Sequence, residues 1–448
     1  MTFEDLARAL EAAIARDDRD AIAQRVAELN PADMADFIEN VRQPELEIEL
    51  LMALPLERRA DTFGYLPLPV QQQLASRLPP AVLAELVTAM PADERADLFN
   101  VLDEGVRRLL FTRLAREERE DLRRLASYEE GTAGAVMTSD YAAVPNGLTV
   151  AEALETLRLT APDKETIYQA FVVDKDHRLK GVISLRELIL AVPSSRVDDL
   201  MEREVVSADV STSQEEVARL ISRYDLLALP ILNSGGKLVG IVTYDDAMDV
   251  AEAEATEDMH KGATVGKLDA SFREASPLSL YRSRVHWLVV LVFANIFTGA
   301  GIAFFEQTIS AHIALLFFMP LLVASAGNAG AQSATLMVRG LATGDVSARD
   351  WAKLLGREIL VAGALGLTMA AAVMVVGVFR AGPEIAAVVA LTMMLVVMIG
   401  SLIGMGLPFL LDKLKFDPAT ASTPLITTLA DVSGVLIYFG LATVLLGI

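Results

Sequence analysis

The sequence predicts a multidomain membrane protein in which an acidic soluble half precedes a helical membrane half. The chain of 448 residues is 53% apolar yet carries a formal charge of −21, an unusual pairing for one domain. Residues 1–275 hold 52 acidic and 30 basic residues, whereas 276–448 are nearly neutral and contain five long apolar stretches. We therefore expect an all-α N-terminal solenoid, a repeated α/β unit, a connecting helix and an α-helical membrane domain with five transmembrane helices.

Regularly spaced prolines mark the first domain, which we place at 1–130. Pro31, Pro55, Pro67, Pro79 and Pro91 are separated by 12 residues or a multiple of 12. Proline fits the first turn of a helix, and each proline is followed by polar and then apolar residues. This pattern predicts a stack of short helices, a small solenoid. Ordinary helical packing with proline starts is the alternative.

Two similar units fill 131–253. Each predicts a helix, a strand, a turn, a second strand and a helix, with the strand-forming runs at 170–174 and 179–188 and again at 228–232 and 238–246. Both end in Gly-x-h-(Ser/Thr)-x-x-(Asp/Glu), and this order resembles a tandem pair of CBS domains. In that family the hydroxyl and the acid can bind a nucleotide ribose, although the same residues would also cap the next helix. The resemblance implies a site for ATP or another adenine nucleotide at Ser184, Arg186, Glu187, Thr243 and Asp246.

An acidic helical segment follows at 245–281, and we assign 254–281 to a connecting helix. Glu254, Glu257 and Asp258 are spaced so that they stack on one face, where like charges repel and weaken an isolated helix. A bound divalent cation would relieve this repulsion. A solvated face without a ligand is the ordinary alternative.

The membrane domain, at 282–448, is expected to cross the bilayer at 285–305, 313–338, 354–379, 385–411 and 419–447. Each stretch meets the ~20 residues that a crossing needs. Basic residues flank alternate loops, at Arg282, Arg284, Arg339, Arg349, Lys353, Arg357, Lys413 and Lys415, and the other loops hold only Arg380. The positive-inside rule then predicts a multi-pass plasma (inner) membrane protein with a cytoplasmic N-terminus and an outside C-terminus. The charged N-terminus, which does not read as a signal peptide, agrees with this orientation.

One acid, Asp431, lies about a dozen residues inside the last span. An intramembrane carboxylate is costly and by default marks an ion or proton pathway. Thr427 lies one turn before it, and a second polar island runs from Asn328 to Thr335 in another span, so that these oxygens can line a wet passage. A carboxylate paired within the bundle is the alternative, but the span contains no basic residue.

Oxygen ligands without cysteine or clustered histidine select hard cations. One carboxylate is too few to dehydrate Mg²⁺, which gives up water reluctantly. Two carboxylates that face each other across a twofold axis could hold hydrated Mg²⁺ through its waters. Five helices also make a poor pore alone, so we expect a homodimer with the pore on its axis.

The domain order and three motifs, at 327–335, 417–419 and 424–434, resemble the MgtE family of magnesium channels over essentially the whole chain. The resemblance implies a Mg²⁺-selective channel or transporter that moves Mg²⁺ into the cytoplasm and that closes when intracellular Mg²⁺ binds the cytosolic domains. It implies pore ligands at Asp431, Thr427, Thr423 and Thr335, to which the polar island adds Asn328. It implies sensor ligands at Asp61, Asp93, Glu215, Asp225, Asp246, Asp249, Glu254, Glu257, Asp258 and Asp417.

The sequence departs from the family pattern at two positions. Ala326 stands where the family usually has glycine, and Ala331 stands where it often has a second polar residue. Either change can alter the geometry of the pore. Permeation of Co²⁺ or Mn²⁺ therefore stays open.

Two other functions compete with the channel. A proton- or Na⁺-coupled divalent cation transporter would use Asp431 to bind its driving ion, and its flux would collapse without that gradient. A membrane receptor whose CBS pair reads nucleotide would show no ion flux. We expect no enzyme, since no paired intramembrane aspartates and no nucleophile–base arrangement occur, and no nucleic acid partner, because phosphates would be repelled by the acidic half. Membrane lipid is the remaining expected partner.

Overall fold

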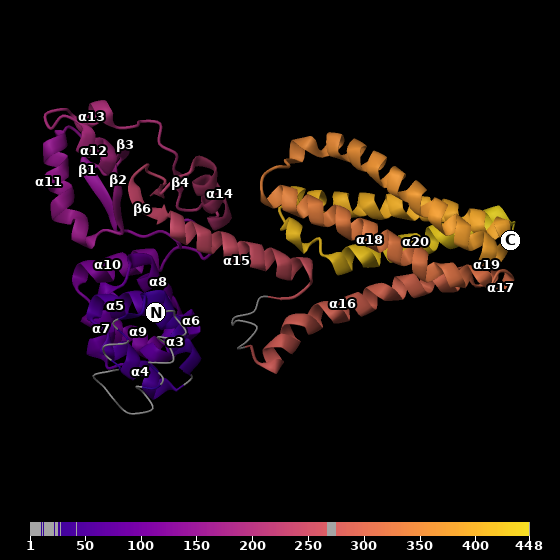
Figure 1. Cartoon of the computed structure of the whole chain (residues 1–448), viewed down its shortest axis with the longest axis horizontal. Coiled ribbons are helices and arrows are strands. Elements are labelled where there is room, and N and C mark those ends of the chain that lie inside the picture. The colour runs from indigo at the N-terminus through magenta and orange to yellow at the C-terminus, as the bar shows by residue number, and fades with distance from the viewer. Residues whose placement is uncertain are drawn as a thin grey trace. The chain divides into compact units, whose positions relative to one another are not determined.

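The structure is a computed structural model that describes residues 10, 12, 22, 26, 28–41, 43–266 and 275–447. It divides into two compact units, Met1–Glu252 and Ala253–Ile448, and each unit is described by itself. Figure 1 shows the helical and mixed parts of the first unit and the long helices of the second.

Short helices form the first part of unit 1. They are α3 (Pro31–Val41), α4 (Pro44–Ala53), α5 (Leu56–Gly64), α6 (Leu68–Ala75), α7 (Pro80–Ala89), α8 (Ala92–Val101), α9 (Glu104–Arg113) and α10 (Arg116–Leu125). Proline stands at the N-cap of α5, α6, α7 and α8, where the chain is extended before it turns into the helix. From α3 to α10 each helix packs against the helix two further along, as a superhelical stack requires. The expected helical N-domain is confirmed.

Two three-stranded sheets with the same order form the rest of unit 1. The first contains β1 (Tyr141–Pro145), β2 (Thr166–Val173) and β3 (Leu179–Ser184), and the second contains β4 (Ala208–Asp209), β5 (Ala228–Leu232) and β6 (Leu238–Thr243). In each sheet the first pair of strands is parallel and the second pair is antiparallel. The associated helices are α11 (Val150–Thr160), η1 (Ala161–Asp163), α12 (Leu185–Leu190), α13 (Val197–Leu200) and α14 (Gln214–Tyr224).

The two sheets exchange edge contacts, which joins the repeated units into one pair. Thr138, ahead of β1, pairs with Ile241 of β6 through two backbone hydrogen bonds of 2.9 and 3.0 Å. Glu202, ahead of β4, pairs with Val182 of β3 through two bonds of 2.9 Å. Each unit therefore contributes a segment that extends the sheet of the other, as expected for a tandem CBS pair.

Helix α15 (Tyr244–Gly262) crosses from unit 1 into unit 2 without interruption. It ends sooner than the segment 245–281 that we expected to be largely helical, because Thr264 adopts a left-handed conformation with φ 57°. A β-branched residue rarely adopts this conformation, so the helix stops sharply. Residues 267–274 of the expected helix lie outside the described residues.

Unit 2 consists of helices. They are α16 (Pro277–Phe304), α17 (Glu306–Ala311), α18 (Ala314–Ala342), η2 (Ala348–Asp350), α19 (Trp351–Lys413), η3 (Pro418–Thr420) and α20 (Thr423–Leu446). Among the described residues, α16, α18, α19 and α20 are long and apolar enough to cross a membrane.

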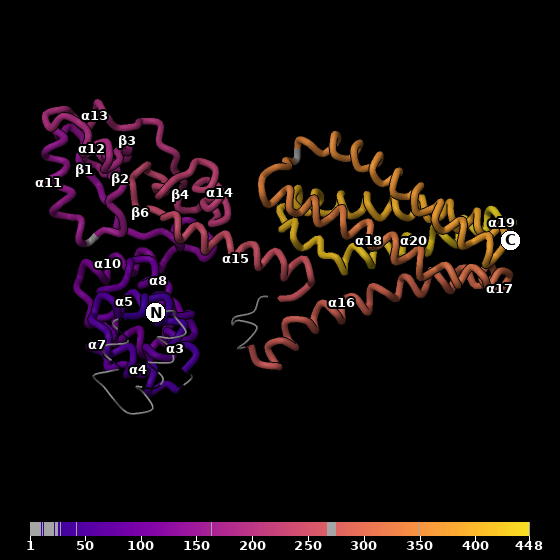
Figure 2. The backbone as a smooth tube through the Cα atoms, viewed as in Figure 1, coloured from indigo at the N-terminus to yellow at the C-terminus, as the bar shows by residue number. Residues whose placement is uncertain are grey.

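Helix α19 has 63 residues, which at 1.5 Å per residue would be about 95 Å if it were straight. It is interrupted at Gly382, which has a φ of 84° and is not helical. A side chain at Gly377 would touch Ala386, and one at Gly366 would touch Met394, so the two halves lie antiparallel. Figure 2 shows the same reversal. The expected number of five crossings remains a prediction.

Candidate ion pathway and cation-sensing sites

Small residues bring α18 unusually close to α19. A Cβ atom at Gly400 or Gly404 would collide with the carbonyl oxygen of Ala326 or Gly330, respectively. Membrane helices use such residues to let their backbones approach. Ala326 is itself buried at this contact, with 1% of its surface exposed. The alanine that departs from the family pattern therefore packs against α19 and does not enter the polar face of α18.

The polar face of α18 carries Asn328, Gln332 and Thr335, all of which are exposed. Their spacing of four and three residues places them on one side of the helix. On α20, Thr423, Thr427 and Asp431 recur every four residues and form a second polar stripe. The two stripes are on packed helices: a side chain at Gly327 of α18 would lie 3.0 Å from Thr427 Cγ2. The two polar stripes thus lie on neighbouring helices, and their role in a passage remains a prediction.

The threonine hydroxyls use their own helices as acceptors. Thr427 Oγ1 and Thr428 Oγ1 each donate to the carbonyl oxygen of Pro424 at 2.9 Å, and Thr335 Oγ1 donates to that of Ala331 at 2.9 Å. Their oxygen lone pairs are then available to a hydrated ion. Asp431 is half-buried, and it makes no hydrogen bond or ion pair with any described residue. The alternative of a carboxylate paired within the bundle therefore has no support in the described chain.

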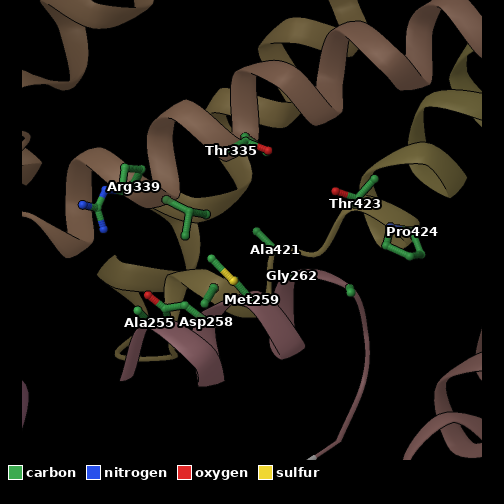
Figure 3. Close-up of a pocket in the computed structure, with 13 residues that line it drawn as sticks. Ala255, Asp258, Met259, Gly262, Thr335, Arg339, Ala421, Thr423 and Pro424 are labelled. Carbon is green, nitrogen blue, oxygen red and sulfur yellow. The ribbon is translucent and has the colours of Figure 1, made fainter. Parts of the chain in front are cut away.

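A cavity of about 690 Å³ lies between the end of α15 and the helices of the membrane half. Figure 3 shows Asp258 and Met259 of α15 on one side and Thr335 and Arg339 of α18 on the other, with Thr423 at the start of α20. The cavity thus joins two of the expected pore residues to the connecting helix. Asn328, Thr427 and Asp431 do not line it.

Beside this cavity, a lysine neutralises the acids of the connecting helix. Lys261 Nζ lies 2.5 Å from Glu257 Oε1 and 2.5 Å from Asp417 Oδ2, and all three side chains are 31–43% exposed. Burial alone would lower the pKa of Lys261, but the hydrogen bonds to Asp417 and Glu257 raise it, so the ammonium stays charged. Burial, followed by the charge of Asp417, raises the pKa of the neighbouring Asp258.

A second acid cluster forms in unit 1, where Asp93 of α8 and Asp246 of α15 approach each other from the helical N-domain and the CBS pair. Burial and neighbouring carboxylates raise the pKa of Asp93 to about 6 and that of Asp246 to about 7. Burial and the charge of Glu57 raise the pKa of the expected ligand Asp61, which is exposed. Three expected sensor residues therefore lie in or beside one negatively charged region.

Sequence reasoning missed three members of this cluster. Burial and the charges of Asp93 and Glu165 raise the pKa of Glu94 to about 8. The pKa of Asp97 rises to about 6 and that of Glu165 to about 7. The spacing of Glu94 and Asp97 after Asp93 on one helix was a signal that could have found them. No such signal marks Glu165, which directly precedes β2.

The negative charge of the cluster favours binding of a cation, but its carboxylates do not form a complete coordination site. Asp93 Oδ1 and Glu94 Oε2 are buried and accept no hydrogen bond, and such orphaned oxygens are costly. Within the described ranges no three acidic or imidazole groups converge closely enough to hold a metal ion. The side chains of Asp97 and Glu165 also keep contact with solvent, which screens their charges. The half-buried Asp93, Glu94 and Asp246 are therefore the stronger candidates.

An adjoining cleft of about 930 Å³ separates the helical N-domain from the first CBS sheet. Asp61 and Glu165 line it, together with five further carboxylates. Two basic residues of the cleft form ion pairs with one of these carboxylates: Arg95 Nη2 lies 3.6 Å from Asp140 Oδ2, and Lys164 Nζ lies 3.9 Å from Asp140 Oδ1. The excess of acids makes this boundary repulsive unless cations enter it.

The other expected sensor residues lie elsewhere. Glu215 is in the first turn of α14, and Asp225 caps the other end of that helix in a left-handed conformation with φ 51°. Asp249 lies on α15 one turn beyond Asp246, where burial and the charge of Asp245 raise its pKa. Glu254 lies further along the same helix, in unit 2.

The expected nucleotide residues are engaged in helix caps. Ser184 Oγ accepts from the Glu187 amide at 3.1 Å, and Glu187 Oε2 accepts from Ser184 N at 2.9 Å. In the second CBS domain, Asp246 Oδ2 accepts one hydrogen bond from the Thr243 hydroxyl and another, at 3.4 Å, from the Thr243 amide. The capping role is confirmed for Ser184 and Glu187, and in the second CBS domain the Asp246 carboxylate caps the Thr243 amide. Arg186 lies in the first turn of α12.

These features define a class: a helical membrane protein with an acidic soluble region that contains a CBS pair. Three segments match families described as MgtE intracellular N domain (29–131), CBS domain (133–194 and 197–253) and divalent cation transporter (319–441). The magnesium transporter MgtE of Thermus thermophilus is 46% identical over 73% of this chain and 73% of its own. That of Bacillus subtilis is 40% identical over 73% and 72%. The chain belongs to the MgtE family.

Solved structures agree with this assignment for the soluble half. The cytosolic domain of the Mg²⁺ channel MgtE in complex with ATP has 39% identity and a TM-score of 0.53, and it covers 55% of this chain and 99% of that one. The soluble part of a magnesium transporter has 30% identity and a TM-score of 0.53, over 57% and 100%.

Proposed function

We propose that this protein is a Mg²⁺ channel or transporter that carries Mg²⁺ across the plasma membrane into the cytoplasm. The observation that carries the proposal is the stripe of Thr423, Thr427 and Asp431 on α20, beside the polar face of α18. Membership of a family whose relatives are magnesium transporters supports it. Asp431 has no partner among the described residues, as a ligand for a passing cation requires.

The stripe suits a hydrated cation. Four residues of helix rise about 6 Å, so Thr423 lies about 12 Å from Asp431 along the axis. Mg²⁺ keeps most of its waters, so the threonine oxygens can accept hydrogen bonds from those waters while Asp431 supplies the charge. We propose that a homodimer places two Asp431 carboxylates across the pore. The exposed polar face of α18, with Asn328 and Thr335, completes the lining.

Intracellular Mg²⁺ is proposed to close the passage. The carboxylates around Asp93 and Asp246 repel one another until cations enter, after which the helical N-domain is held against the CBS pair. We propose that α15, the helix that contains both Asp246 and Glu257, passes this change on to the cavity lined by Asp258, Thr335 and Thr423. Binding must favour the closed state by its differential affinity for the two states.

Further parts of the proposal rest on the sequence. The charge of the loops favours a cytoplasmic N-terminus and an outside C-terminus. The solved relative that holds ATP supports adenine nucleotide binding by the CBS pair of this chain. We propose no enzymatic activity, since the relatives are named as transporters.

The test of conduction is flux in proteoliposomes. Asp431→Ala should abolish Mg²⁺ uptake while the protein remains folded, and Asp431→Asn should lose selectivity for divalent ions because it loses the charge. Glu384→Gln, near the end of a span, is the control and should conduct normally. Uptake by Asp431→Ala at the wild-type rate contradicts the proposal. Wild-type flux that collapses without a proton or Na⁺ gradient supports the coupled transporter instead.

The test of closure uses electrical recording with Mg²⁺ varied on the face that carries the soluble half. With Asp246, Asp249 and Glu257 all changed to alanine, the pore should stay open at high Mg²⁺. If this variant closes at the same Mg²⁺ concentration as the wild-type protein, these three residues are not the Mg²⁺ sensor of the gate.

A further inference from the structure

The ammonium group of Lys261 lies at the contact between the connecting helix and the loop before α20. Lys261 Nζ lies 2.5 Å from Glu257 Oε1 and 2.5 Å from Asp417 Oδ2. Glu257 is four residues away on the same helix, but Asp417 is 156 residues away in the sequence. The ion pair with Asp417 is therefore a tertiary contact, unlike the pair with Glu257, which any exposed helix can form.

Asp417 transmits this contact to the start of the pore helix. Its second carboxylate oxygen accepts from the Ala419 amide at 2.8 Å, and its carbonyl oxygen accepts from the Thr420 amide at 3.1 Å. These bonds form η3, which leads within three residues to Thr423. The position of Lys261 is thus coupled, through one side chain, to the first polar residue of the stripe.

The helix that carries Lys261 is also held beyond its end. Gly266 N donates to the Ser283 carbonyl oxygen of α16 at 2.8 Å, and Thr264 turns the chain there. Two anchors, one to the loop before α20 and one to α16, therefore fix the last turn of α15. The cavity that contains Met259, Thr335 and Thr423 lies against this turn.

We propose that Lys261 is a positioning residue for closure, whose ammonium holds the connecting helix on the Asp417 loop in place of a divalent ion. Without it, Glu257, Asp258 and Asp417 would leave three carboxylates facing one another. The contact then closes without bound Mg²⁺, and the Mg²⁺ dependence of closure comes from the acid cluster of unit 1. This inference rests on the proposed function. It adds that the ammonium of Lys261, and not Mg²⁺, neutralises the carboxylates of Glu257 and Asp417.

The test compares variants of the full-length protein in membrane patches, as Mg²⁺ is varied on the face of the soluble half. Lys261→Met should raise the Mg²⁺ concentration for half-closure about three-fold, the scale of one partly exposed ion pair, and should make the dependence on Mg²⁺ steeper. The steeper response arises because a divalent ion must now replace the ammonium. Lys261→Arg should restore the wild-type midpoint. Lys261→Gln provides a second neutral variant if Lys261→Met does not fold.

Two controls separate positioning from a general effect. Lys413→Met removes a charge from the last residue of α19, just ahead of the same loop, at an exposed site without a described ion pair, and it should leave the midpoint unchanged. Asp417→Asn keeps an oxygen to cap Ala419 but loses its charge, so the shift caused by Lys261→Met should disappear in that background.

An unchanged midpoint in Lys261→Met, or an equal shift in Lys413→Met, overturns this inference while wild-type flux and closure leave the proposed function intact. Loss of all Mg²⁺ flux from the wild-type protein would count against the proposed function instead.

Discussion

The two acidic regions of this protein solve the same electrostatic problem in different ways. In unit 1, Asp93, Glu94 and Asp246 are half-buried together, and their pKa values rise to between about 6 and 8. In unit 2, Glu257 and Asp417 share the ammonium of Lys261. In the part of the chain that the structure describes, no lysine or arginine pairs with these three acids of unit 1, so protons or metal ions must neutralise them. In unit 2 the ammonium of Lys261 already neutralises the acids, so this contact should respond far less to Mg²⁺.

The largest expected effect comes from removing the charge of the unit 1 cluster. In wild-type protein, millimolar Mg²⁺ should slow proteolysis of the soluble half by roughly ten-fold, as expected for weak carboxylate sites. Asp93→Asn combined with Asp246→Asn should abolish this protection, since neither amide attracts the ion. Asp176→Asn, an exposed acid in the turn between β2 and β3, is the control. Full Mg²⁺ protection of the double variant would show that the cluster is not the sensor.

The second prediction concerns pH in the absence of Mg²⁺. Acids whose pKa is raised on folding stabilise the folded state below their unfolded pKa, and this stabilisation is lost as pH rises through the folded pKa. For Asp93, Asp246 and Glu94 that window opens at their ordinary pKa values of 3.8, 3.8 and 4.5 and closes at their folded values of about 6, about 7 and about 8. The unfolding temperature of unit 1 should therefore fall by several degrees across it, on the order expected for 1–2 kcal/mol.

Thermal unfolding of the full-length protein in detergent with a chelator, followed by circular dichroism, measures this effect. Added Mg²⁺ should flatten the pH dependence because it replaces the protons. An unfolding temperature that rises between pH 6 and 8 would contradict the assignment.

A third prediction concerns a variant in which a lysine is introduced into the acid cluster of unit 1, as Lys261 is present among the acids of unit 2. Asp97 is exposed at the edge of the cluster and its charge acts on that of Asp246. Asp97→Lys should raise the unfolding temperature in chelator by about 2–4 °C and weaken the protection by Mg²⁺, because a tethered ammonium now neutralises the acids. Asp97→Leu separates the removal of an acid from the addition of a cation. Equal behaviour of the two variants would show that the new cation contributes nothing.

The smallest effect is expected at Asp258, beside Lys261. Because the contact already contains a cation, Asp258→Asn should change the Mg²⁺ concentration for half-closure by less than about two-fold, as for a surface charge. Electrical recording measures it against wild type and against Asp93→Asn. A shift as large as that of Asp93→Asn would mean that both regions sense Mg²⁺ alike.

The sequence by itself determined the parts of this protein that depend on local pattern. Proline spacing predicted the short helices, the repeated strand pattern predicted the CBS pair, and hydropathy separated the membrane half. The resulting family and fold class are confirmed. Asp431 stood out because a charge inside an apolar stretch is costly wherever the stretch lies. The roles of the individual pore and sensor residues remain predictions.

Only the tertiary structure decided which charges meet. Glu165 joins Asp93 and Glu94 because β2 and α8 come together in the folded unit, and no local pattern of residues around Glu165 records that approach. The sequence placed Glu257, Asp258 and Asp417 among metal ligands, but the fold sets Lys261 between two of them. Coulomb energy depends on distance in space and on burial, whereas the sequence specifies only the order of charges along the chain.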